Sequence, residues 1–399
     1  MQAVSGLLSP ATLDDPYPLY AQLRADGPVH RIAGTDFYLA TTWEAVQEAA
    51  GRPDDFSSNL TATLLRDGVQ TSTFDLGAVN TAGHVLATGD DPLHAQQRKL
   101  VLPSLVARRI QALEPDLTDI SRRLWHAGAV DGRIEWMSAM GDLLPMTLVA
   151  RLIGLPGDDV PQLVQWGYGS TELLGGVFDL EHIGTAVSTS AQLAGYLYGK
   201  FTEAQANPND DLLGDLARAV AADQIAAEVA VLMLVQLVGA GGESTAGLIG
   251  NAARLLATLP DIQAQVRSDP RLLPVLLEET LRLESPFRNH HRHVRAATTL
   301  AGVPLPRDAH LLLMWGSANR DPAAFDDPDL LQLDRPNPRN HLAFGKGLHF
   351  CVGAALARTE ARIAITTLLA ATDRFELADA EWVPSIMVRR HRRLELHYH

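Results

Sequence analysis

Four segments of the chain repeat apolar residues at the spacing of a helix. Apolar side chains recur every three to four positions in residues 105–126, 225–259, 271–283 and 351–372. This period gathers them on one face of an α-helix, where they can pack against other elements. The pattern therefore predicts long helices as the dominant element of the fold.

Strand patterns are fewer and shorter. Residues 29–41 and 299–315 contain short apolar runs that glycines and prolines interrupt, which is typical of strands joined by turns. Residues 57–90 and 167–210 mix polar and apolar positions and predict neither state. Length alone permits two or three domains, but no repeat or linker divides the chain. We therefore expect one mainly α domain with a small β region.

Composition and charge narrow the classes of function. Of the 399 residues, 46% are apolar, and the formal net charge is −14, which argues against a general nucleic-acid binder. The longest apolar run, residues 229–242, contains Gln236 and is shorter than the roughly 20 residues that span a bilayer. The N-terminus lacks the basic and apolar regions of a signal peptide. We expect a cytoplasmic protein without a membrane segment.

The single cysteine, Cys351, lies in a glycine-rich loop. The glycines of residues 344–353 allow a tight turn and a close approach of the backbone to another group. Helix formers follow the cysteine, so the positive end of a helix dipole is expected to stabilise its thiolate. Such a thiolate serves as a nucleophile or as a metal ligand. A buried, inert cysteine that happens to begin a helix is the alternative.

The pattern Phe-Gly-x-Gly-x-His-x-Cys-x-Gly, complete from Phe344 to Gly353, resembles the haem-binding signature of the cytochromes P-450. The resemblance implies the fold of that family over residues 1–399 and haem b (iron protoporphyrin IX) as the cofactor. Cys351 then corresponds to the axial iron ligand and His349 to a partner of a haem propionate. Phe344 is expected to pack beside the thiolate.

A second motif of the same family lies in the predicted helix at residues 271–283. Glu279 and Arg282 share a helix face at the spacing i, i+3 and can form an ion pair, although most such pairs are solvated surface pairs. By resemblance they correspond to the family's Glu-x-x-Arg motif, with Arg335 as its third member. The three residues are expected to form a buried network that supports the cysteine loop.

Further cationic side chains resemble the family's propionate ligands. His94 and Arg98 share a helix face at the spacing i, i+4, which suits an anionic group, although an ordinary polar helix face gives the same pattern. Arg292 corresponds to another propionate-binding arginine. Together with His349, these residues give two arginines and two histidines for two carboxylates.

Glycines interrupt the long apolar helix at residues 237–247, just before Glu243, Ser244 and Thr245. They are expected to loosen the helix and to open a local bulge for O₂ and water. The spacing fits no phosphate-binding loop, whereas a glycine contact patch between packed helices is an open alternative. By resemblance Glu243 is the acid of the family's acid–alcohol pair, and Ser244 replaces the usual threonine. Thr245 is an alternative source of the hydroxyl.

The substrate is the least determined feature. If residues 287–292 are extended, alternation places Arg288 and His290 on the same side as Arg292, where they could line the pocket. Family position adds Ala240, Gly241 and Met387 as pocket candidates. Residue types do not name the substrate.

An electron donor is also implied, because no flavin or iron–sulfur segment is fused to the chain. A ferredoxin with its reductase is the expected partner of this monomer. Lys346, Arg358 and Arg362 surround the cysteine loop and could form a basic docking patch, or they are scattered solvated charges.

The resemblance implies a haem-thiolate monooxygenase that uses O₂ to oxidise a small organic molecule, in secondary metabolism. Oxidative coupling or ring closure on the same fold is an alternative. A haem sensor without catalysis is a further one, from a different class.

Overall fold

The computed structural model describes residues 3–67, 70–77, 83–172, 175 and 180–399. Its helices are α1 (Pro10–Asp14), α2 (Tyr17–Asp26), α3 (Trp43–Ala50), α4 (Leu93–Val101), α5 (Ala107–Gly128), α6 (Leu143–Ile153), α7 (Val160–Glu172), α8 (Leu180–Ala206), α9 (Leu212–Ala221), α10 (Ala227–Thr258), α11 (Pro260–Ser268), α12 (Leu273–Leu283), α13 (Trp315–Ala318) and α14 (Ala354–Ala370). Single turns are η1 (Leu86–Thr88), η2 (Leu102–Leu105), η3 (Met137–Gly141), η4 (Gly157–Asp159), η5 (Pro270–Leu272) and η6 (Gly347–His349).

The strands form one larger sheet and several small ones. They are β1 (Ala3–Val4), β2 (Val29–Ile32), β3 (Phe37–Ala40), β4 (Phe56–Ser57), β5 (Ala62–Asp67), β6 (Gln70–Asp75), β7 (Arg133–Glu135), β8 (His290–Val294), β9 (Thr298–Leu300), β10 (Val303–Leu305), β11 (His310–Leu313), β12 (Phe375–Trp382) and β13 (His391–Tyr398). The larger sheet has the order β1-β2-β3-β11-β8-β4, and a smaller one the order β12-β13-β7. β9 pairs with β10 and β5 with β6 as antiparallel hairpins.

The predicted helices are confirmed within a few residues of their ends. Residues 105–126 and 225–259 correspond to α5 and α10, and residues 271–283 to η5 and α12. One difference affects the site: α14 begins at Ala354 and not at Cys351. The mixed segments contain β5, β6 and η1 in residues 57–90, and the end of α7 and all of α8 in residues 167–210. Positions 68–69, 78–82, 173–174 and 176–179 lie outside the described residues.

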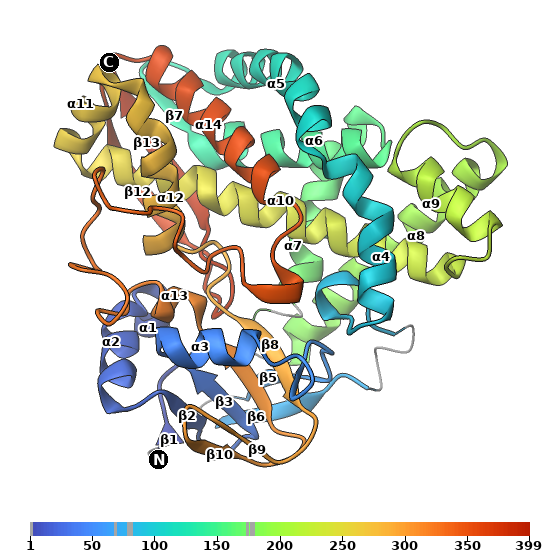
Figure 1. The fold of residues 1–399 in the computed structure, drawn as a ribbon. Coiled ribbons are helices and arrows are strands. Elements are labelled where there is room, and N and C mark those ends of the chain that lie inside the picture. Colours follow the sequence, from blue (N-terminus) through green and yellow to red (C-terminus); the bar gives the residue numbers. More distant parts are fainter. Residues whose placement is uncertain (1–2, 68–69, 78–82, 173–174, 176–179) are drawn as a thin grey trace.

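The larger sheet and the longer helices occupy two regions of the molecule, and α10 runs through the helical region (Figure 1). The larger sheet, α1–α3 and α13 lie together at the end that contains the N-terminus, and the longer helices fill the other end. Side chains of α10 belong to both helical cores, with α5, α12 and α14 on one side and α6–α9 on the other. α10 is long and apolar enough to cross a membrane, but 56% of its most apolar stretch is buried inside the protein, as in a core helix.

Candidate functional site

A cavity of about 260 Å³ lies between the cysteine loop and the middle of α10. Cys351 and Phe344 line it from the loop, and Ala240, Ser244 and Thr245 line it from α10. Most of the remaining lining is aliphatic or aromatic. A concave, mainly apolar site with a few polar groups is the usual form of a small-molecule site.

The cysteine loop is closed by its own backbone. The Cys351 N–H donates to the Phe344 carbonyl oxygen at 2.9 Å. Gly347 has φ +73°, and a side chain there would also meet the Ala50 carbonyl oxygen at 2.9 Å. Only glycine meets both conditions, so the loop passes close under α3 and turns Cys351 toward the cavity.

The environment of the thiol differs from the expectation of a helix terminus. Because α14 begins at Ala354, Cys351 lies outside its first turn. Burial raises the pKa of the Cys351 thiol, and the backbone N–H of Gly353 opposes this only in part. Cys351 therefore precedes α14, and the N–H group of Gly353 lowers the thiol pKa as predicted, but burial outweighs it. A bound metal ion is what deprotonates a coordinating thiol.

Four cationic or potentially cationic side chains line the same cavity. These are His94, Arg98, Arg292 and His349. The rings of His94 and His349 are 4.1 Å apart, and Arg98 Nη2 donates to the Phe350 carbonyl oxygen at 2.8 Å. Burial lowers the pKa of Arg292 to about 10, and burial with Arg292 and His94 lowers that of His349 to about 3. An anion placed among these groups would relieve both effects.

The acid and the alcohol that are neighbours in sequence face different surroundings. Ser244 and Thr245 line the cavity, and Ser244 Oγ donates to the Ala240 carbonyl oxygen at 2.6 Å. Glu243 is buried and lies outside the lining. Its Oε1 accepts from Nε and Nη2 of Arg390 at 3.2 and 3.1 Å, and Thr171 Oγ1 donates to its Oε2. One helix position turns a side chain by about 100°, which separates the two groups.

The glycines of α10 do not open a bulge, so that prediction is wrong. The helix continues through Gly239, Gly241 and Gly242. A Cβ atom at Gly241 would come within 2.8 Å of Val149 Cγ2, and one at Gly242 would overlap Met146. The glycines therefore allow α6 and α10 to pack closely, which is the alternative that the sequence left open.

Comparison with known proteins decides the family. Residues 219–387 match the family model described as Cytochrome P-450. The chain is 54% identical over 387 residues to Cytochrome P-450 144 of Mycobacterium tuberculosis, covering 96% of this chain and 89% of that protein. The chain belongs to the cytochrome P-450 family. It is also 32% identical over 387 residues to Cytochrome P-450 monooxygenase PikC of Streptomyces venezuelae, covering 94% and 89% of the two chains.

A solved structure gives the same result for the fold. P450BioI, in complex with an acyl carrier protein that carries hexadec-9Z-enoic acid, superimposes with a TM-score of 0.88 at 26% identity, covering 98% of this chain and 100% of that chain. The predicted fold, mainly α with a small β region, is confirmed. Relatives named monooxygenase or hydroxylase make this chain a cytochrome P-450 oxidoreductase.

The cavity fits the haem of this family. Haem carries two carboxylates, and the cavity offers two arginines and two histidines. Among the described residues, Arg292 donates only to the carbonyl oxygen of its neighbour His291, at 2.7 Å. A buried guanidinium without an anionic partner is costly, so this donor set suits a ligand with carboxylates. Cys351 Sγ is the one thiol available to bind its iron.

Behind the cysteine loop of this cytochrome P-450, the Glu279 network is buried. Arg282 binds Glu279 through two hydrogen bonds of 2.7 and 2.9 Å, and Arg335 Nε donates to Glu279 Oε1 at 2.9 Å. Burial raises the pKa of Glu279, but the hydrogen bonds and the charge of Arg282 outweigh it and lower the pKa overall. Arg282 also donates to the carbonyl oxygens of Asn319, Pro328 and Leu330, which ties α12 to the segment before the loop.

A second carboxylate, which sequence reasoning missed, holds the loop more directly. Glu278 accepts two hydrogen bonds from Arg358, at 2.6 and 2.9 Å, and one from His341 at 2.9 Å. The guanidinium of Arg358 lies 4.5 Å from the centre of the Phe344 ring. The only available signal was the pair of adjacent glutamates, since nothing in the sequence joins Glu278 to α14.

These contacts change the predicted docking patch. Arg358 turns inward to Glu278, so it is not a free surface charge. Arg362 pairs with Glu114 at 2.8 Å, and Lys346 donates to Gln47. The three residues lie around the loop as predicted, but two of them are neutralised by carboxylates.

The structure divides the predicted pocket residues. Ala240, Gly241 and His290 line the cavity, whereas Arg288 and Met387 do not. Extended pairing in β8 begins only at His290, so the alternation assumed from Arg288 onward fails. Arg288 is fully buried and its backbone N–H donates to the Met387 carbonyl oxygen at 2.6 Å.

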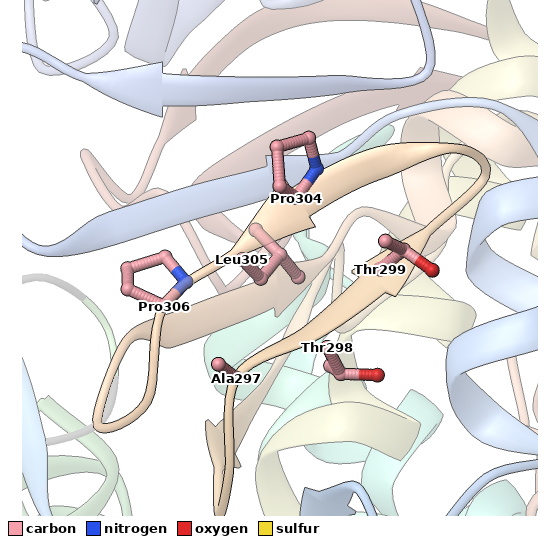
Figure 2. A pocket seen from close by; sticks show the side chains of 6 residues that line it. All are labelled: Ala297, Thr298, Thr299, Pro304, Leu305 and Pro306. Carbon is pink, nitrogen blue, oxygen red and sulfur yellow. The ribbon is translucent and has the colours of Figure 1, made fainter.

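A second hollow lies on the β9–β10 hairpin and is lined by Ala297, Thr298, Thr299, Pro304, Leu305 and Pro306 (Figure 2). None of these side chains titrates or binds a metal. This hollow therefore lacks the thiol and the cationic side chains that line the cavity beside Cys351.

Proposed function

We propose that this cytochrome P-450 is a haem-thiolate monooxygenase that oxidises a small organic substrate in the cavity beside Cys351. The observation that carries the proposal is that one cavity is lined by a thiol, by hydroxyl-bearing residues of α10, and by two arginines and histidines that can bind an anion. The combination matches what binding of haem and of O₂ requires. The need for a reduced Cys351 supports a cytoplasmic location.

Cys351 would hold the iron through Sγ, and His94, Arg98, Arg292 and His349 would neutralise the two propionates. Haem bound through a thiolate supplies the activation of O₂, because the sulfur donates electron density that favours O–O cleavage. The aliphatic lining would exclude water from the reacting centre and orient the substrate.

Proton delivery in this proposal uses the cavity-facing hydroxyls. Ser244 Oγ would hold a proton at the cavity wall, with Thr245 as the alternative hydroxyl. Glu243 would act from behind, as a positioning group. Burial raises its pKa, opposed by Arg390 and Thr171, so it takes up a proton more readily than an exposed glutamate. Arg390 fixes where that carboxyl group lies.

The proposal includes a ferredoxin with its reductase as the electron donor and a monomeric enzyme. The lining is mostly apolar, which favours a substrate with little charge, such as those of secondary metabolism. Support for a partner surface comes from the exposed residues Leu348 and Phe350, which lie on the loop just before the cysteine.

The test begins with the reduced, CO-bound Soret band of the haem-loaded protein. The wild type is expected to give the band of thiolate ligation, and Cys351→Ser is expected to lose it while retaining its fold by circular dichroism. A screen of small molecules for spin-state shifts then identifies substrates. A product with one added oxygen supports monooxygenation, whereas loss of two hydrogens would indicate oxidative coupling. Electron consumption that no bound molecule stimulates would contradict both.

A further inference from the structure

His290 has its protonation state set by a neighbouring indole. Trp315 is buried, and its Nε1–H donates to His290 Nδ1 at 2.8 Å. An indole N–H can only donate, so Nδ1 of His290 must be the accepting, unprotonated nitrogen. The proton of the neutral ring is therefore on Nε2, on the opposite side of the ring.

The charge around His290 favours the same neutral tautomer. Burial, followed by the charges of Arg292, His291 and His349, lowers the pKa of His290 to about 3. The ring of Phe287 contacts it edge-on, with the two ring centres 5.7 Å apart. The imidazole is thus held between two aromatic side chains as a rigid donor.

The Nε2–H of His290 has no hydrogen-bond partner among the described residues. The ring lines the cavity, and among the described residues its one hydrogen bond is that from Trp315. In the proposed function, His94, Arg98, Arg292 and His349 would serve the two haem carboxylates, which leaves His290 without that role. A donor that leaves water without finding an acceptor is costly, so the occupant of the cavity must supply one.

We propose that His290 selects substrates that present an oxygen acceptor, such as a carbonyl, ether or hydroxyl oxygen, to its Nε2–H. The inference rests on the proposed function and specifies its substrate class: a mainly apolar molecule with one oxygen acceptor near Phe287 and β8. A haem carboxylate is the other source of the same acceptor chemistry, and the experiment separates the two.

The test compares two probes of the same skeleton, 4-phenylcyclohexanone and phenylcyclohexane, in the haem-loaded protein. Their dissociation constants are measured from the optical spin-state shift in the wild type, His290→Phe and Trp315→Phe. His293→Phe is the matched control, since His293 lies on the same strand but outside the cavity lining and pairs with Asp308. The rate of haem transfer to apomyoglobin is measured for each protein.

The wild type and the control are expected to prefer the ketone by about fivefold, the factor that corresponds to a net hydrogen bond of roughly 1 kcal/mol. His290→Phe should remove this preference, and Trp315→Phe should reduce it, because Nδ1 can then carry the proton. A general structural defect would weaken both probes equally and leave their ratio unchanged.

Other results would overturn the inference. A wild type that does not bind the ketone, or an unchanged ratio in His290→Phe, refutes the substrate assignment. If haem transfer accelerates while the ratio stays the same, the acceptor is the haem carboxylate. Failure of the proposed function is distinct, because the wild type would then lack the thiolate Soret band before any probe is added.

Discussion

Substituting Glu278 by glutamine tests how the cysteine loop is held. The carboxylate receives two hydrogen bonds from Arg358 and one from His341. Glutamine has nearly the same shape but removes the charge and replaces one acceptor oxygen by a donor group that faces these cations. Arg358 packs on Phe344, whose carbonyl oxygen binds the Cys351 N–H, so the loss reaches the thiolate.

The size of the effect follows from the pKa of Glu278. Burial raises this pKa, but the hydrogen bonds from His341 and Arg358 and their charges outweigh burial and hold it at about 2. Relative to an ordinary glutamate, the shift corresponds to roughly 3 kcal/mol of stability at neutral pH. Because the Arg358 side chain is 23% exposed, water screens part of the pair, and about 2 kcal/mol is expected.

The assay is urea unfolding of the haem-loaded protein, monitored by circular dichroism. The midpoints are compared between proteins whose unfolding free energy has the same slope against urea concentration. Arg339→Ala is the matched control: Arg339 approaches the same carboxylate at 3.8 Å, but its side chain is 76% exposed, so the change should cost less than about 0.5 kcal/mol. The contribution of Glu278 is present above its unfolded pKa and declines as the pH falls through 4.5 toward 2. Glu278→Gln should also displace part of the reduced, CO-bound Soret band from the thiolate position. A change in unfolding midpoint no larger than that of Arg339→Ala would refute this reasoning.

Three further predictions concern other parts of the protein. Burial raises the pKa of Asp142 to about 6, so Asp142→Asn should stabilise the protein by up to about 3 kcal/mol at pH 7.5. Because the native acid is increasingly protonated below pH 6, the urea midpoints of the wild type and the variant should converge as the pH falls. A difference that stays constant with pH would contradict the assignment. Ser244→Ala should increase the peroxide released per electron consumed, measured with a ferredoxin system, whereas unchanged coupling would exclude this hydroxyl from proton delivery. Gly214→Ala places a Cβ against the Asn209 carbonyl oxygen and should lower the free energy of unfolding by about 1–3 kcal/mol. The control Gly195→Ala, whose Cβ meets no atom within 4 Å, should not destabilise the protein. Equal effects of the two substitutions would show that the clash at Gly214 is relieved.

Features encoded by neighbouring residues could be predicted from the sequence. The long helices follow from apolar periodicity, and the cysteine loop follows from glycines and a thiol within ten positions. Glu279 and Arg282 pair because residues three apart share a helix face. The expectations for Arg288, Arg358 and the α10 glycines failed for a common reason. Each depended on which neighbour the side chain would meet, and the local sequence does not contain that neighbour.

The sequence by itself determined the chemistry of the site: a single thiol in a turn that only glycines allow, close to residues able to bind an anion. The tertiary structure alone decided how that chemistry is directed. Glu243 meets Arg390, 147 positions away, and therefore lies outside the cavity beside its neighbour Ser244. His290 meets Trp315, 25 positions away, and this contact fixes the nitrogen that donates into the cavity. Helix period and turn geometry act over a few residues, whereas the partners of a buried polar group are set by the packing of distant segments.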